Sequence, residues 1–521
     1  MLNMKAVEIV AALQKKELSA REVADAHIGR IEEVNPRLNA VIYPLFEKAR
    51  TAADRVDARR MRGEPVGPLE GLPMTIKDQF IVDGTPTSLG LAHRSKEILH
   101  GEGPLVRRLR KADAVFLGKT NLPQLLVSYE CRHALYGPAN NPWDTGRAPG
   151  GSSGGEAAII AAGGSPLGLG ADMGGSLRIP AHCCGVYALK PTEHRFPNDD
   201  TPLDRGYFGG LAGFEGFVQQ PGPLARSVDD LKLLMDVLLK EPLPGALPAP
   251  WDGGPLRDEV KGLTIGFFTD NGLFPASPAI RTAVEDAARA LEGLGARVVP
   301  FAPPDPVKGI ALYLSLIGAD GAHWMVDALA GEKPVGGIGN FIRSARTPAA
   351  MRGTMRALLR SLGQTSADFL MAHVRAADAA EYWRLCAERS AYRTRFRTAM
   401  EQGKIDILLC PSFGLPAVPH DASYKGAGVF AASYSMLFNL LGMPAGVAPV
   451  ARIPESGESD RVSSRDGVVR DAIAIERGSA GLPVGVQMAG HHWREDQVFA
   501  VMKALEEAFP FRTMASTPSP R

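Results

Sequence analysis

A glycine-rich stretch between residues 149 and 180 limits what this chain can fold into more than any other part of the sequence. Two serines stand there in glycine-rich turns, within Gly150-Gly-Ser152-Ser-Gly-Gly155 and within Gly174-Gly-Ser176. Glycine adopts positive φ readily and lets other groups approach the main chain, as a site built from backbone N–H donors requires. A flexible linker would carry polar residues throughout, whereas residues 157–162 are apolar, mostly small and helix-compatible. The stretch therefore predicts two tight turns separated by a helix.

The alternation of strand and helix patterns predicts the fold class. Residues 71–78 read as a short buried strand, and residues 263–301 read as a strand, a helix and a second strand, which is typical of units that add parallel strands to a sheet. Residues 305–400 are mainly helical. Strand-like segments return at residues 405–409, 444–450, 471–475 and 481–487. We expect an α/β fold with a single large mixed β-sheet core flanked by helices.

Three local patterns give sharper expectations. Residues 4–34 predict two amphipathic helices, the second opened by a capping box of Ser19 and Glu22 and ended by Asn35-Pro36. Residues 121–124 are expected to open another helix. The apolar residues 183–189 read as a buried strand that Lys190-Pro191 stops.

Charge and cysteine content exclude several classes of protein. The chain has 58 Lys and Arg against 57 Asp and Glu, a net charge of +1, so no global field attracts nucleic acid or anionic lipid. Its five cysteines form no C-x-x-C pair, the N-terminus shows no secretory leader, and no run of about 18 uncharged apolar residues predicts a transmembrane segment. We expect a soluble cytoplasmic protein with no transmembrane segment and no nucleic-acid partner. A homodimer is compatible with the sequence.

Familiar catalytic motifs fit the glycine-rich stretch poorly. Gly150 to Gly154 matches G-x-S-x-G, but the nucleophile elbow needs a strand before the serine, and residues 141–149 are loop. No G-K-[ST] follows the glycines, which argues against a phosphate site. The histidines, such as His133, His182 and His194, stand at no metal-ligand spacing. We expect neither a metal nor a cofactor.

Lys77 closes the apolar strand of residues 71–78 and offers a different base. A lysine in such a place usually has its stem on apolar surface and its ammonium in water. Buried, its pKa would fall by several units from about 10.4, and the neutral amine could take a proton. Asp78 beside it could be a counter-ion, although neighbours in a strand point to opposite faces. A serine and a lysine can together replace the usual serine and histidine.

These residues resemble the amidase signature family of amide hydrolases. The resemblance is carried by Lys77, the glycine-serine run from Gly150 to Gly155, and Gly174-Gly-Ser176, with Ser176 placed 24 residues after Ser152, and it extends over nearly the whole chain. Residues 121–124, 128–131, 141–143 and 434–439 are more similar to the fatty-acid amide hydrolases than to the amidotransferase A-type subunits that work on charged tRNA. Ala171 departs from the family, which usually has Thr or Ser there.

The resemblance implies a Ser-Ser-Lys arrangement. Ser176 is the expected nucleophile, Ser152 the proton relay, which also contacts the substrate, and Lys77 the base. The resemblance also implies a cis peptide bond between Gly151 and Ser152. We expect an amide to be cleaved to an acid and an amine or ammonia through an acyl-enzyme.

Further residues receive supporting roles by the same resemblance. The expected oxyanion donors are the backbone N–H groups of Met173, Gly174, Gly175 and Ser176. Ser153, Asp172 and Arg178 are expected to support the loop, with a purely structural role for the ion pair left open. Leu126 is expected to contact the substrate, with ordinary core packing as the alternative. The rest of the pocket is expected from segments around residues 205–220, 305–380 and 430–445.

The resemblance implies one amidase domain over residues 1–521. It divides into a helical N-terminal segment (1–65), a catalytic core (66–240), a sheet extension with a variable helical pocket region (255–430), and a C-terminal sheet and helix (431–515). The expected substrate is a small-molecule carboxylic amide, with fatty-acid and aryl amides both left open. Two alternatives stay open: a glutamine-hydrolysing amidotransferase of the A type that works on charged tRNA, and an inactive binding protein with this fold.

Overall fold

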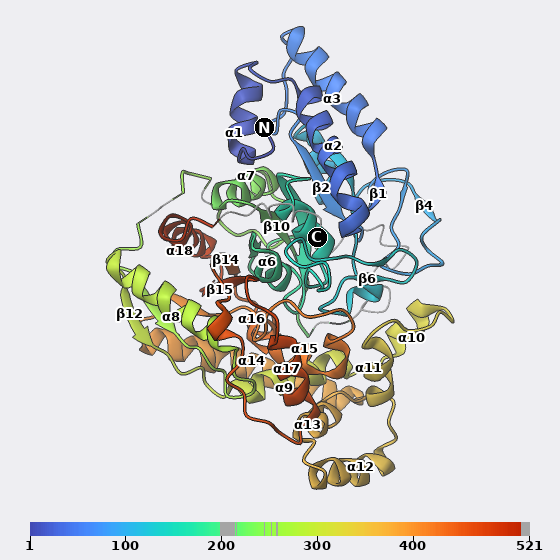
Figure 1. Cartoon of the computed structure of the whole chain (residues 1–521), viewed down its shortest axis with the longest axis vertical. Coiled ribbons are helices and arrows are strands. Elements are labelled where there is room, and N and C mark those ends of the chain that lie inside the picture. Colours follow the sequence, from blue (N-terminus) through green and yellow to red (C-terminus); the bar gives the residue numbers. More distant parts are fainter. Residues whose placement is uncertain (198–213, 215, 244, 252, 257–258, 512–521) are drawn as a thin grey trace.

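The central element of the fold is one mixed β-sheet. The computed structural model describes residues 1–197, 214, 216–243, 245–251, 253–256 and 259–511. Eleven strands follow the order β1-β5-β2-β8-β10-β9-β14-β15-β13-β11-β12 in that sheet, and helices flank it (Figure 1). The predicted α/β class with a large mixed sheet is confirmed.

The N-terminal half of the chain supplies the first six strands of this order. They are β1 (Val41–Pro44), β5 (Val115–Thr120), β2 (Pro73–Lys77), β8 (Leu167–Asp172), β10 (Gln220–Ala225) and β9 (Tyr187–Lys190). Strand β2 pairs in parallel with both β5 and β8. All five of its residues are buried, which explains why this segment is apolar apart from Thr75 and its terminal lysine.

The C-terminal half supplies the other five strands. They are β14 (Ala445–Arg452), β15 (Pro483–Gly490), β13 (Ile407–Pro411), β11 (Thr264–Phe267) and β12 (Arg297–Pro300). Strands β11 and β12 are parallel neighbours joined through helix α8 (Pro278–Gly293), as predicted. Two short hairpin-like pairs lie outside the large sheet: β3 (Thr85–Pro86) with β4 (Ile98–Leu99), and β6 (Arg132–His133) with β7 (Gly137–Pro138).

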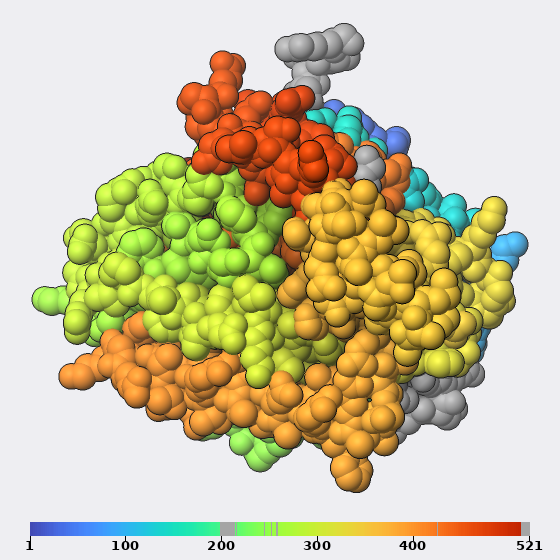
Figure 2. All heavy atoms as spheres, turned by 90° about the horizontal axis from the view of Figure 1, so that it is seen from below, coloured from blue at the N-terminus to red at the C-terminus, as the bar shows by residue number. Residues whose placement is uncertain are grey.

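Helices surround the sheet and extend the molecule at one end. Those beside the sheet are α1 (Ala6–Gln14), α2 (Ala20–Leu38), α3 (Phe46–Met61), α4 (Pro104–Lys111), α5 (Gly154–Ala161), α6 (Arg178–Cys184), α7 (Val228–Leu239), α16 (Ser433–Leu441) and α18 (Glu495–Ala508). A second group gathers at the lower end in Figure 1: α9 (Pro306–Gly318), α10 (His323–Leu329), α11 (Ile338–Ala345), α12 (Ala349–Ser361), α13 (Thr365–His373), α14 (Ala379–Gln402), α15 (Ala427–Ala431) and α17 (Gly467–Glu476). Figure 2 views this end, where the yellow-green to orange segments form most of the surface.

The end of α2 differs from the prediction. The capping box at its start is confirmed, because Ser19 accepts from the Glu22 N–H and Glu22 accepts from the Ser19 N–H. The helix then runs past Asn35 and Pro36 to Leu38. The Asn35 side chain accepts the N–H groups of Ala40 and Val41, so it ties down the chain that follows the helix instead of ending the helix itself.

Three other expectations were wrong. Residues 121–124 open no α-helix; a single 3-10 turn covers Gln124–Leu126, with Leu125 and Leu126 at φ of 55° and 62°. Residues 183–189 were predicted as a strand, but the first two belong to helix α6. The helix ends at Gly185, which has φ of 69°, and strand β9 begins only at Tyr187. Residues 471–475 lie in α17, whose N-cap Asp466 accepts from the Val468 N–H. An apolar run of this length suits a helix or a strand equally, so packing decides between them.

Within the described ranges, none of the helices is long and apolar enough to cross a membrane.

Candidate active site

Lys77 stands at the carboxyl end of β2 and points into the protein. Its Nζ lies 2.8 Å from Oγ of Ser152 and 3.5 Å from the carbonyl oxygen of Ala171, and the side chain is fully buried. Asp78, the next residue, forms a separate buried ion pair with Lys119, at 3.0 Å. Asp78 is therefore not the partner of Lys77, as the alternation of side chains along a strand predicts.

Burial governs the protonation of Lys77. It lowers the pKa of this amine from 10.5 to about 7, against the opposing influence of Cys131, Asp172 and Glu156. Burial also raises the pKa of the Cys131 thiol to about 12 and that of the Glu156 carboxyl to about 8, so both are largely neutral at pH 7. Asp172 is already paired with Arg178. Among the described residues Lys77 has no free counter-ion, and much of it is neutral amine near pH 7.

The loop before α5 holds Ser152 against the lysine. The Gly151–Ser152 peptide bond is cis. Gly150 has φ of 82°, and a Cβ at Gly151 would lie 2.4 Å from the carbonyl oxygen of Ser128, so these two positions need glycine. The Ser153 N–H donates to the Ser176 carbonyl at 3.0 Å. The two glycine-rich turns are thereby joined by a direct hydrogen bond.

Asp172 and Arg178 form a buried ion pair under the second turn. The guanidinium donates to both Asp172 oxygens at 2.9 Å. It also donates to three further oxygens, those of the Ser435 carbonyl, the Asn439 side chain and the Gln487 side chain. Burial opposes ionisation of Asp172, but the charge and hydrogen bonds of Arg178 hold the pKa of this carboxyl well below its ordinary value. Asp172 therefore remains ionised at neutral pH.

Asp172 also engages one of the four expected oxyanion donors. Its Oδ1 accepts the Gly175 N–H at 2.7 Å. The N–H groups of Met173, Gly174 and Ser176 have no hydrogen-bond partner among the described residues. Of the four expected donors, three therefore have no hydrogen-bond acceptor among the described residues, and the fourth is bound by Asp172.

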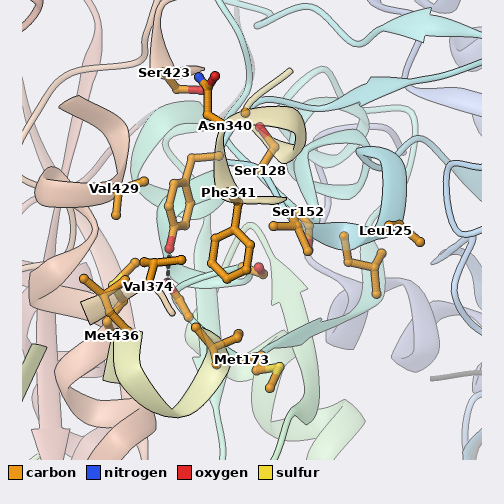
Figure 3. Close-up of a pocket in the computed structure, with 18 of the residues that line it drawn as sticks. Leu125, Ser128, Ser152, Met173, Asn340, Phe341, Val374, Ser423, Val429 and Met436 are labelled. Carbon is orange, nitrogen blue, oxygen red and sulfur yellow. Dashed lines mark hydrogen bonds between the residues drawn. The ribbon is translucent and has the colours of Figure 1, made fainter. Parts of the chain in front are cut away.

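Ser152 and Ser176 both line a cavity of about 280 Å³. Figure 3 shows Ser152, Leu125, Met173, Phe341 and Met436 around this space. The lining is mostly aliphatic, aromatic or hydroxyl-bearing: Leu125, Leu126, Val127, Ser128, Tyr129, Ser152, Met173, Gly174, Ser176, Gln219, Tyr313, Leu314, Ile317, Trp324, Gly337, Asn340, Phe341, Ser344, Leu370, Val374, Ser423, Tyr424, Gly426, Val429 and Met436. No charged side chain belongs to the lining among the residues that the structure describes.

The expected pocket segments contribute unequally to this cavity. Leu126 lines it, and so do residues from the expected ranges 305–380 and 430–445. Of the range 205–220, Gln219 lines the cavity, while residues 205–213 and 215 lie outside the described residues. Ser423, Tyr424, Gly426 and Val429 also line it; they lie between the three expected pocket segments but within the pocket region expected over 255–430.

Three residues near the site were not predicted from the sequence. Tyr129 and Tyr313 line the cavity and donate to the carbonyls of Gly174 and Met173. Glu156, buried on α5, accepts from the hydroxyls of Thr75 and Thr120 at 2.7 and 2.9 Å. Tyr129 and Glu156 stand inside or beside the motifs that carried the resemblance, whereas Tyr313 lies in a helix whose sequence contains no signal.

Known proteins with a similar sequence share one family. A family model described as Amidase matches residues 22–499. The chain is 32% identical over 514 residues to fatty-acid amide hydrolase 1 of Sus scrofa, covering 96% of this chain and 84% of that protein. It is 31% identical over 515 residues to the glutamyl-tRNA(Gln) amidotransferase A-type subunit of Synechococcus sp. (strain CC9605), covering 95% and 94%.

Solved structures agree with these relatives. A fatty acid amide hydrolase matches with a TM-score of 0.86 at 25% identity, covering 98% of this chain and 86% of that chain. A bacterial aryl acylamidase of the amidase signature family matches with a TM-score of 0.75 at 26% identity, covering 100% and 99%. Fold and relatives together define an enzyme of the amide hydrolase class. The chain belongs to the amidase signature family.

Proposed function

We propose that this protein is a serine amidase that cleaves amides of hydrophobic carboxylic acids through a Ser-Ser-Lys triad. One observation carries the proposal: a buried lysine with a pKa of about 7 lies 2.8 Å from Ser152, and Ser152 shares an apolar cavity with Ser176. Ser176 is the nucleophile, Ser152 the proton relay and Lys77 the base.

The first half of the reaction forms an acyl-enzyme. Oγ of Ser176 attacks the amide carbonyl, its proton moves to Oγ of Ser152, and the proton of Ser152 moves to the neutral Nζ of Lys77. The negative charge that develops on the carbonyl oxygen is held by free backbone N–H groups of the Met173 to Ser176 turn. Collapse of this intermediate breaks the C–N bond, and the proton returns through Ser152 to the leaving nitrogen, because an amide anion is a very poor leaving group.

The second half releases the acid. Water attacks the ester on Ser176 and gives a proton through Ser152 to Lys77. When the ester bond breaks, Oγ of Ser176 recovers this proton by the reverse route. The net reaction converts amide and water to carboxylic acid and amine or ammonia, and the enzyme is regenerated without a cofactor.

The character of the cavity supports a hydrophobic substrate. Glutamine carries an ammonium and a carboxylate beside each other, and these ions require charged or well-placed N–H partners. The described cavity lining contains no charged side chain, whereas the walls from Leu125, Ile317, Phe341 and Val429 suit hydrocarbon. This favours a fatty or aryl acid amide over the glutaminase alternative.

Two experiments test the proposal. The first treats the wild-type protein and Ser176→Ala with a fluorophosphonate probe and maps the modified peptide by mass spectrometry; we expect one adduct on Ser176, absent from the variant. Ser152→Ala should still be labelled, but more slowly, because it keeps the nucleophile and loses the relay. Undiminished amide turnover by Ser176→Ala would refute the assigned nucleophile.

The second experiment compares substrates. A panel extends from acetamide and glutamine through aryl amides to long-chain primary amides, each assayed at equal concentration. We expect kcat/KM to rise with apolar content and ammonia release from glutamine to be negligible. A preference for glutamine would favour the amidotransferase alternative instead, and no turnover of any amide would favour a binding protein.

A further inference from the structure

Two carbonyl groups in the turn before Ser176, those of Met173 and Gly174, each accept a hydrogen bond from a tyrosine hydroxyl. Tyr313, on α9, donates to the carbonyl of Met173 at 3.2 Å. Tyr129, in the segment after the 3-10 turn, donates to the carbonyl of Gly174 at 3.1 Å. Both tyrosines line the cavity. The substrate cavity and the turn that carries Ser176 are therefore connected through two specific hydrogen bonds.

The planarity of the peptide group gives these bonds a consequence. In a trans peptide the C=O and the N–H point in opposite directions, so fixing one fixes the other. The bond from Tyr313 to the Met173 carbonyl fixes the direction of the Gly174 N–H. The bond from Tyr129 to the Gly174 carbonyl likewise fixes the Gly175 N–H, which donates to Asp172 on the opposite side at 2.7 Å.

Other bonds hold the flanking peptide groups in the same way. The Asp172 carbonyl accepts from Asn439 at 3.4 Å, and the Gly175 carbonyl accepts from the Ile179 N–H at 2.7 Å. Every peptide carbonyl from Asp172 to Gly175 thus accepts a hydrogen bond. The N–H groups of Met173, Gly174 and Ser176 have no acceptor among the described residues, and the bonds to the carbonyls fix their directions. Two consecutive glycines would otherwise let these peptide planes rotate easily.

Each tyrosine ring packs against an aromatic neighbour, Tyr129 against Phe413 with ring centroids 6.2 Å apart and Tyr313 against Phe217. The ring of Phe217 stacks on that of Tyr313, with centroids 4.5 Å apart and planes 19° apart. Burial raises the pKa of both tyrosines above the ordinary value of 10.0, so both hydroxyls stay donors across the working pH range. A Cβ at Gly174 would lie 2.4 Å from the Tyr313 hydroxyl oxygen, which shows how closely this hydroxyl covers the turn.

We propose that Tyr313 and Tyr129 are positioning residues of the Met173 to Ser176 turn: Tyr313 aims the Gly174 N–H at the oxyanion, and Tyr129 holds the next peptide group, whose N–H is bound by Asp172. The inference rests on the proposed function. Neither tyrosine needs to react or to exchange a proton. Their hydroxyls make the donors rigid before the charge develops, and preorganised donors stabilise a transition state without a cost of reorientation.

Removal of the hydroxyl alone tests the idea. We expect Tyr313→Phe to lower kcat on a neutral amide by about 10- to 100-fold, less than the roughly 100- to 1000-fold cost of removing one oxyanion donor, because the Gly174 N–H is kept and only its direction is released. We expect KM to change less than about twofold. Binding of a trifluoromethyl ketone, which forms a charged adduct with a serine, should weaken in parallel. Binding of the uncharged alcohol analogue should not. Tyr129→Phe should act in the same direction with a smaller loss.

Tyr392→Phe is the matched control, because the Tyr392 hydroxyl is buried and has no hydrogen-bond partner among the described residues. It should leave kcat, KM and ketone affinity unchanged. A merely structural role for Tyr313 would lower thermal stability while kcat and ketone affinity stay at the wild-type level, and that result would overturn the inference.

A double-mutant cycle gives an independent reading if one variant folds poorly. Gly174→Ala places a methyl group against the Tyr313 hydroxyl, so its effect on kcat should be much smaller in the Tyr313→Phe background than in the wild type. Additive effects would count against the inference. Labelling of Ser176 by the fluorophosphonate probe separates the two proposals: if labelling persists and the tyrosine variants keep full kcat, the positioning role fails while the proposed function stands.

Discussion

Nζ of Lys77 and Oγ of Ser152 lie 2.8 Å apart at the end of a strand whose five residues are all buried. The serine belongs to the loop before α5, and α5 leads into β8, the parallel neighbour of β2. No described carboxylate forms an ion pair with this amine. The lysine is fully buried, and burial lowers its pKa to about 7, so its protonation state changes near neutral pH.

The pH dependence of turnover should follow the protonation of Lys77. The base must be neutral, and its pKa is about 7, so kcat/KM should be nearly constant above pH 8 and fall about tenfold per unit well below pH 7. A neutral amide assayed between pH 5 and 9 gives the profile. A flat profile through pH 6 would rule out Lys77 as the base.

The free energy of unfolding should also depend on pH through Lys77, and it should rise as the pH rises. Lys77 has a folded-state pKa of about 7 against about 10.4 in the unfolded chain. Below pH 7 both states hold the proton and the folded protein carries the full cost of a buried charge. From pH 7 to about 10 only the unfolded state stays protonated, so the stability contribution rises with pH, and above that range the cost is gone.

Lys77→Met should consequently unfold at a higher urea concentration than the wild type. The gain should be greatest near pH 6, on the order of a few kcal/mol, and should shrink toward pH 10. Urea titrations at pH 6, 8 and 10 measure it. The exposed Lys15→Met is the control and should show no such pH trend. A loss of stability at pH 6 would contradict the prediction.

Arg178→Lys should destabilise the fold although it keeps the charge. Arg178 is wholly buried and makes five hydrogen bonds, two of them to Asp172. The ammonium group of a lysine cannot reproduce this planar set of donors. Leaving buried Asp172 poorly paired costs about 3 to 5 kcal/mol in the limiting case. Urea unfolding measures the loss, and Arg21→Lys, at an exposed pair with Asp25, should leave the midpoint unchanged.

Leu126→Trp should narrow the substrate range. Leu126 lines the cavity, and an indole in its place removes space that a long acyl group would occupy. We expect KM for long-chain amides to rise at least about tenfold, equivalent to about 1.4 kcal/mol, while small aryl amides change little. Leu294→Trp, at a position that is 50% exposed, is the control. Equal losses for all substrates would indicate damage to the turn instead of the cavity.

Much of the site could be predicted from the sequence because its chemistry is concentrated in short motifs. Glycines mark the turns around Ser152 and Ser176, and an apolar strand ending in a charge marks Lys77. Long segments such as α2 and α8 were also predictable, since the capping box of α2 and the amphipathic period of α8 are local signals. These features depend on a few neighbouring residues and little else.

Short apolar segments were not predictable in the same way. The residues from Arg178 to Lys190 divide into α6 and β9 at Gly185, yet their apolar side chains suit either conformation. The helix forms where Asp172 accepts the Leu177 N–H at 3.1 Å and binds Arg178. That partner comes from the preceding strand, so only the folded arrangement selects the helix.

The sequence by itself indicated the family through its short motifs, the α/β class through the alternation of strand and helix patterns, and Lys77, Ser152 and Ser176 as the candidate triad. Only the tertiary structure decided that Gly175 gives its N–H to Asp172, that no charged side chain joins the described cavity lining, and that Tyr129 and Tyr313 hold the turn before Ser176. Tyr313 meets Met173 across 140 residues of chain. Such contacts arise from packing between distant elements, and no local pattern of residues records them.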